Sequence, residues 1–220
     1  MAQPVPVIED IDIATLMADP YPSFDRIREL GSAVWVSSAN IHLVTRFTDI
    51  MHVEKNHADF ASTNPQSLMN RVMGHSLMRK DDEDHQAERA AVDPSFRRGM
   101  VRDHWAPVFQ ALTDQLIDQF VDDGRTDLFN AFAAPMASLS LAEMLGFRDV
   151  AWQDLAHWSQ SLMDGVSNYG ADPEIEDRGQ AASRAINDAI DAVLPDHRAD
   201  HNPTILSSMA HADSPHSIEQ

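Results

Sequence analysis

Apolar residues recur every three or four positions along most of the chain after residue 85, and this period predicts helices. The expected helices cover residues 101–121, 127–146, 152–163 and 175–193. The second of them has Asp127 at its start and Gly146 at its end, as helix termini prefer. A polar connection is expected from Pro195 to Pro203. Residues 214–220 then have a serine and an acid at cap spacing, which predicts the start of one more helix.

The first eighty residues show shorter patterns. A helix is expected over residues 18–31, because Asp19-Pro20 opens an apolar stripe that Gly31 closes. Residues 33–36 and 41–44 are β-rich runs that predict a hairpin. A further helix is expected from Thr48-Asp49, with Ile50, Met51 and Val53 inward. Residues 61–78 contain the breakers Pro65 and Gly74 and are expected to be irregular. Long loops of this kind are usually functional or disordered.

These elements together predict a mainly α fold with a small N-terminal β-hairpin or sheet. The chain has 220 residues, which is enough for one sizeable core. Neither a repeat nor a linker is visible, so we expect one partial domain over residues 1–220. Residues 1–17 are expected to form an extended tail.

The charge and the hydropathy pattern exclude some classes of function. The formal net charge is -19, which argues against a nucleic-acid partner because phosphates would repel this surface. No apolar run reaches the roughly 18 residues of a membrane span. Residues 1–10 carry two acids and no basic residue ahead of an apolar stretch, unlike a signal peptide. The expected location is therefore the cytoplasm.

The sequence contains no cysteine, which excludes disulfides, thiolate metal sites and a cysteine nucleophile within these residues. The eleven histidines are scattered singly, and neither a zinc motif nor a Gly-rich phosphate loop is present. The acidic run at residues 81–84 lacks the ligand spacing and the glycine of a calcium loop. No metal site is expected.

The segment that contains His85 and Arg89 offers a candidate binding face. The two residues are four apart, so on a helix their side chains rise from the same face. An imidazole and a guanidinium are both donors, and together they suit a carboxylate or a phosphate. Spacing alone favours a plainer interpretation, in which this is a solvated helix start whose acids complement the helix dipole.

Five phrases of the sequence, in this order, resemble the N-terminal half of a soluble bacterial cytochrome P450. They are Asp19-Pro20-Tyr21-Pro22-Ser23-Phe24 with Arg28-Glu29; Leu43-Val44-Thr45-Arg46-Phe47-Thr48-Asp49-Ile50; Asp59-Phe60-Ala61-Ser62; Asp81-x-x-x-His85-x-x-x-Arg89 with Phe96; and Leu141-Ala142-Glu143-Met144-Leu145-Gly146. The resemblance runs from about residue 18 to residue 220. It implies the family's helices A to about H, before the oxygen-binding helix I.

This resemblance implies a partner for the candidate face. In the family the corresponding residues reach the propionates of haem b, so His85 and Arg89 would hold the haem by charge-assisted hydrogen bonds. Two departures from the family pattern bear on this role. The proline pair often found before the histidine is replaced by Asp82-Glu83, and the arginine common two residues after it is replaced by Ala87.

The resemblance also implies a substrate pocket and a docking face. The loop over residues 67–78 and the helix near residue 162 would contribute apolar lining for a small apolar organic substrate; the lining residues are Met69, Val72, Met73, Leu77, Leu162 and Met163. A core role is equally open for each of them. Arg97, Arg98 and Arg102 would form a basic patch where a ferredoxin or flavin-type electron donor docks. Arginines near helix ends also serve the dipole alone.

The family's function is that of a haem-thiolate monooxygenase, which inserts one oxygen atom from O₂ into its substrate. The cysteine that ligates the iron in this family is absent here, so this chain is expected to be inactive alone and to contain no catalytic residue. A partial sequence of an intact monooxygenase is one explanation, and a natural truncated, inert product is the other. A non-enzymatic helical module that binds a ligand or partner is the rival class.

Overall fold

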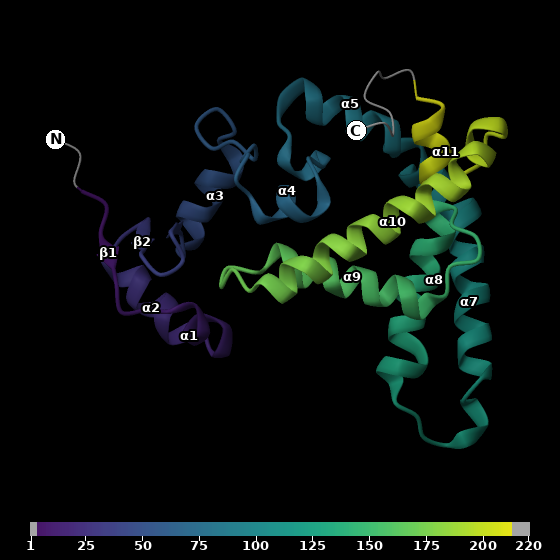
Figure 1. The fold of residues 1–220 in the computed structure, drawn as a ribbon, viewed down its shortest axis with the longest axis horizontal. Helices are drawn as coiled ribbons and strands as arrows, with labels where there is room; N and C mark the ends of the chain where they lie inside the picture. Colours follow the sequence, from purple (N-terminus) through teal and green to yellow (C-terminus); the bar gives the residue numbers. More distant parts are fainter. Residues whose placement is uncertain (1–3, 213–220) are drawn as a thin grey trace. The chain divides into compact units, whose positions relative to one another are not determined.

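The computed structural model describes residues 4–212 of the chain (Figure 1). They form two compact units, one with the residues up to Asn64 and Tyr169–Asp172, the other with Pro65–Asn168 and the residues from Pro173 onward. That residues 1–220 belong to one partial domain stays a prediction from the sequence. The helix start predicted at residues 214–220 lies outside the described residues.

The first unit combines a small sheet with short helices. Its elements are β1 (Val7–Ile8), α1 (Ile13–Ala18), α2 (Tyr21–Leu30), β2 (Val34–Val36), β3 (Ile41–Leu43) and α3 (Phe47–Lys55). The strand order is β1-β2-β3, with β1 parallel and β3 antiparallel to β2. Trp35 lies opposite His42 in the β2–β3 pair. The predicted hairpin is therefore confirmed, and so is the predicted helix that ends at Gly31.

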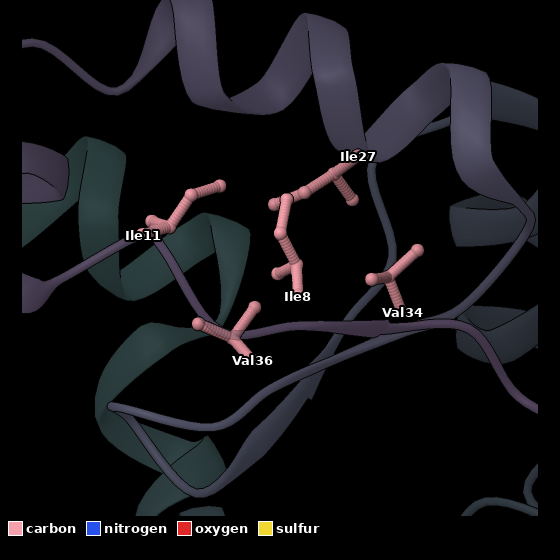
Figure 2. Close-up of a cluster of buried hydrophobic side chains, with 5 residues drawn as sticks. All are labelled: Ile8, Ile11, Ile27, Val34 and Val36. Atoms are coloured by element: carbon pink, nitrogen blue, oxygen red, sulfur yellow. The ribbon is translucent and has the colours of Figure 1, made fainter.

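The core of the first unit differs from the sequence expectation of an extended tail over residues 1–17. Figure 2 shows Ile8 and Ile11 packed with Ile27, Val34 and Val36, and all five side chains are at most 5% exposed. Residues 7 and 8 pair with β2, and α1 begins where the side chain of Asp12 accepts a hydrogen bond from the backbone N–H of Thr15. Burial of these isoleucines stabilises the folded conformation of this segment.

The helix predicted at Thr48 is confirmed as α3, but the prediction that Ile50 faces inward is wrong. Ile50 is 39% exposed, whereas Met51 and Val53 are partly buried. The helix has no fully buried residue, so its apolar side covers the unit only partially.

The second unit is helical throughout. Its elements are α4 (Leu68–Met73), η1 (Leu77–Arg79), α5 (Asp82–Phe96), α6 (Arg98–Met100), η2 (Val101–Trp105), α7 (Ala106–Asp118), η3 (Val121–Asp123), η4 (Phe129–Ala133), α8 (Ala134–Leu145), α9 (Trp152–Val166), α10 (Pro173–Ala199) and α11 (Ile205–Ala210). Of these, η1 and η3 are 3₁₀ turns, and η2 and η4 are π-helical turns.

Two sequence expectations in the second unit need correction. The segment predicted to be irregular contains α4, because Ser67 caps its start with a 3.1 Å hydrogen bond from the backbone N–H of Asn70. The connection expected to begin at Pro195 begins instead after Ala199, because α10 continues through the proline. His197 is buried on the last turn, so this stretch of helix belongs to the core.

The other predicted helices are confirmed. The turn η2 and α7 cover most of residues 101–121, α8 ends at Leu145 before Gly146, and α9 packs against both α8 and α10. The structure is mainly helical with one small sheet, as the sequence predicts. Among residues 4–212, no helix combines the length and the apolar character needed to cross a membrane.

Candidate functional site

The segment with the candidate donors forms the start of α5. Asp82, Glu83 and Asp84 occupy its first turn, where carboxylates complement the positive end of the helix dipole. Asp82 has a φ of 49°, a left-handed conformation that lets the chain turn sharply into the helix. No group of three potential metal ligands occurs within the part of the chain that the structure describes.

His85 and Arg89 lie one turn apart on α5, as their spacing predicts. Arg89 donates a hydrogen bond from Nε to Oδ1 of Asp93 at 2.7 Å, and both side chains are about half exposed. Over residues 4–212, the Nη atoms of Arg89 and the ring nitrogens of His85 make no other hydrogen bond. The two side chains therefore keep donors available for an anionic group.

A buried ion pair fixes the approach to this helix. Lys80, just before α5, contacts the carboxylate of Glu88, and their side chains are only 8% and 17% exposed. A buried charge needs a partner of opposite charge, because otherwise nothing offsets the free energy lost on its desolvation. The loop ahead of α5 is thus tied to its second turn, one residue from Arg89.

A cavity of about 570 Å³ is lined in part by α5, the helix that carries the candidate donors, but neither His85 nor Arg89 is among its lining residues. Glu88 and Val92 line it, and Val92 follows His85 by seven residues, which is about two turns and places both on the same face of α5. The opposite walls come from α8, α10 and α11; their apolar lining residues are Leu145, Ile190, Leu206 and Met209. Sequence reasoning missed these four, because segments distant in the sequence form the wall.

The predicted pocket residues fall into two groups in the structure. Met73 and Leu77 line the cavity. Val72 and Leu162 are 5% and 8% exposed and belong to a helix–helix core cluster instead. Two further methionines also lie outside the lining: Met69 accepts a weak contact from the Ser76 hydroxyl at 3.7 Å, and Met163 is 47% exposed.

The predicted basic patch lies at the break between α5 and α7, and its arginines are exposed. Arg102 donates two hydrogen bonds to the carboxylate of Asp103, both at 2.6 Å. This bidentate pair lowers the pKa of Asp103 and raises the pKa of Arg102. Arg97 and Arg98 have no ion pair with another described residue. The net positive charge of the patch therefore comes from these two.

No family model matches the chain. Among curated proteins, it is 23% identical over 193 residues to pulcherriminic acid synthase of Bacillus subtilis (strain 168). This alignment covers 86% of this chain and 47% of that protein. It is 30% identical over 127 residues to steroid C26-monooxygenase of Mycobacterium tuberculosis (strain ATCC 25618 / H37Rv), covering 58% and 31% respectively. The chain spans at most about half the length of these relatives.

Solved structures give the same picture for the fold. CalO2 superposes with a TM-score of 0.71 and 25% identity, over 90% of this chain and 51% of that one. P450BioI, solved in complex with a fatty-acyl carrier protein, superposes with a TM-score of 0.75 and 16% identity, over 88% and 52%. The Bacillus subtilis 168 cytochrome P450 PksS superposes with a TM-score of 0.68 and 20% identity, over 92% of this chain and 51% of that one.

The sequence relatives include proteins described as cytochrome P450s, and the structural neighbours include cytochrome P450s over about half of their chains. The five segments of the sequence that resemble this family occur in the order that the family has. The chain is therefore a relative of the bacterial cytochrome P450s and corresponds to about half of their fold.

Proposed function

We propose that this chain is part of a haem-thiolate monooxygenase, which inserts one oxygen atom from O₂ into a small apolar organic substrate. The observation that carries the proposal is the pair His85 and Arg89, which lie one turn apart on α5, the helix that also lines the 570 Å³ cavity through Glu88 and Val92. Two donors one turn apart on a helix support a role in binding a haem propionate.

The residues present fit the haem group. Its propionates are carboxylates, and the free donors of Arg89 and His85 suit carboxylates. The apolar part of the cavity wall, with Val92 and Leu206 among its members, suits the porphyrin edge or an apolar substrate. When bound, haem with an axial cysteine thiolate supplies the oxygen activation.

The thiolate has to come from outside these residues, because the 220 residues contain no cysteine. In the proposed enzyme this chain holds the propionates and lines part of the substrate cavity, and it is inactive alone. Met73 and Leu77 are the proposed substrate contacts. Val72 and Leu162 act on the pocket through helix packing, and Met69 and Met163 are proposed to contribute only at its edge.

Electrons are proposed to arrive from a ferredoxin or flavin-type donor at the basic patch. Arg97 and Arg98 carry the unpaired charge there, and Arg102 contributes less because Asp103 neutralises it. A positive patch on a protein of net charge -19 concentrates the field at one place and steers an acidic partner toward it.

The experiment is the spectrum of the ferrous carbon monoxide complex of the purified intact protein. A thiolate-shifted Soret band is the expected result. Haem binding with an unshifted band, or no haem binding at all, overturns the proposal. The 220-residue chain alone is the matched control and is expected to give no thiolate-shifted band, because it has no cysteine.

A second candidate function is a non-enzymatic helical module that binds an apolar ligand. The cavity favours it, because it lies among helices of one compact unit. Isothermal titration of the 220-residue chain with palmitate, a simple apolar probe, separates the two. Saturable binding together with a cooperative thermal transition supports the module, and absence of both rejects it.

A further inference from the structure

The 570 Å³ cavity has a polar strip on α10 as well as an apolar wall. Asn187, Ile190 and Asp191 all line it, and their spacings of three and four residues place them on one face of the helix. The amide of Asn187 and the carboxylate of Asp191 therefore line the cavity one helical turn apart. An apolar cavity with a small number of polar groups is the usual form of a small-molecule site.

The carboxylate of Asp191 lacks a cationic partner within residues 4–212, where it makes neither an ion pair nor a hydrogen bond. Ion pairs along a helix form between residues three or four apart. The residues at these distances from Asp191 are Asn187, Asp188, Leu194 and Pro195. None of them is basic, and Asp188 adds a second negative charge one turn away.

The second carboxylate of the lining, that of Glu88 on α5, is already neutralised. Lys80 contacts it, and both side chains are mostly buried. The lining residues that the structure describes include neither a lysine nor an arginine. His75 also lines the cavity and donates from Nε2 to the carbonyl oxygen of Arg79 at 3.0 Å, so Nδ1 of the neutral ring is an acceptor. The unbalanced charge on the wall is therefore that of Asp191.

We propose that the cavity binds an organic cation, with the positively charged nitrogen beside Asp191 and the apolar body against Leu206 and Met209. A carboxylate attracts a cation more strongly next to apolar walls than in open water, because the local dielectric is lower. The amide oxygen of Asn187 is a further acceptor for an ammonium group. The inference rests on the proposed function for the role of the cavity, and it narrows the substrate class to apolar molecules with one basic nitrogen.

Isothermal titration of the intact protein with two eight-carbon probes tests the inference. Octyltrimethylammonium and octan-1-ol have the same apolar chain, and only the first carries a charge. Its nitrogen has no lone pair, so it cannot bind a haem iron. The cation should bind at least about five-fold more tightly than the alcohol. Equal affinities of the two probes, or no measurable binding of the cation, overturn the inference.

Two variants locate the charge that the cation recognises. Asp191→Asn keeps the shape of the side chain and removes its charge, so it should weaken binding of the cation at least about five-fold and that of the alcohol less than two-fold. Unchanged binding of the alcohol also shows that the cavity is intact. Asp188→Asn is the matched control, because it removes the same charge from α10 at a position that does not line the cavity. Equal losses in the two variants overturn the site at Asp191.

The ferrous carbon monoxide spectrum of the same protein separates this inference from the proposed function. Cation binding that depends on Asp191, in a protein without the thiolate-shifted band, supports the site and rejects the monooxygenase. A protein that has the band but binds both probes equally supports the monooxygenase and overturns the cationic substrate.

Discussion

The buried imidazole of His197 lies with Nε2 3.0 Å from the carbonyl oxygen of Gly146, which joins the last turn of α10 to the end of α8. Nδ1 of the same ring lies 3.1 Å from Nδ2 of Asn202. An amide nitrogen can only donate, so Nδ1 accepts and Nε2–H donates to Gly146. The contact leaves no room at Gly146, where a Cβ would lie 2.5 Å from Cε1 of His197.

Gly146→Ala should therefore destabilise the second unit by about 2–5 kcal/mol, the sum of a left-handed alanine and a steric clash. Gly146 has a φ of 88°. Urea unfolding measures the change. Gly124→Ala is the control, because Gly124 also has a positive φ, 69°, but a Cβ there meets no atom within 4 Å. It should cost only about 1–2 kcal/mol, and equal losses in the two variants would contradict the contact.

The ion pair between Lys80 and Glu88 gives a second prediction. Lys80→Met should cost about 3 kcal/mol of unfolding free energy, because it leaves the Glu88 carboxylate buried without a cation. The double variant Lys80→Met/Glu88→Leu should recover most of the loss. Denaturant titrations of the two variants measure both values.

The control for this prediction is an exposed pair on the same helix. Asp93→Asn removes the partner of Arg89, whose side chain is 53% exposed, and should change the unfolding free energy by less than about 1 kcal/mol. A comparable loss in Asp93→Asn and Lys80→Met would show that burial does not distinguish the pairs.

The sequence predicts the later helices well because their apolar period is long. It misses the β1 strand, because Val7–Ile8 is defined only by its pairing with β2. It also misses α4, whose six residues are too short for a visible period.

The candidate donors could be placed from the sequence because their geometry is local. His85 and Arg89 need only a helix to share a face. The cavity could not be placed in this way, because its walls depend on contacts between distant helices. Val72 and Met73 look alike in the sequence, yet only Met73 lines the cavity, since the notch formed by Gly165 and Gly179 takes up Val72.

The carboxylate of Asp127, at the start of a helical segment, should make the stability of the second unit depend measurably on pH in the acid range. Asp127 accepts hydrogen bonds from the side chain and backbone of Asn130 and from the backbone of Phe129, and these lower its pKa below the ordinary 3.8. Because the pKa of Asp127 is lowered in the folded state, its contribution to the free energy of unfolding is complete above about pH 4. This contribution is lost as the pH falls through the pKa of the folded state.

Two variants separate this titration from the cap itself. Asp127→Asn keeps an acceptor but cannot titrate, so the loss of stability between pH 5 and about pH 3 should be smaller than in the unmodified protein. Asp127→Ala should lower the urea midpoint at neutral pH as well. An unchanged acid dependence in Asp127→Asn would contradict the assignment.

The proposed docking of an electron donor at the basic patch makes a prediction about the intact protein. Arg97→Ala/Arg98→Ala should slow reduction by a ferredoxin donor by about ten-fold at low ionic strength, and the difference should shrink as salt screens the charges. Stopped-flow reduction measures the rates. Arg102→Ala should have a smaller effect, because Asp103 already neutralises its charge. Equal effects of all three arginines, or none, would argue against docking at Arg97 and Arg98.

The central claim is that His85 and Arg89 hold the propionates of haem, and haem release from the intact protein to apomyoglobin tests it. Haem should leave His85→Ala/Arg89→Ala at least ten-fold faster than the unmodified protein, and Arg97→Ala/Arg98→Ala should behave as unmodified. Haem dimethyl ester, whose propionates carry no charge, should leave both proteins at similar rates. A double variant that releases ordinary haem as slowly as the unmodified protein would contradict the account.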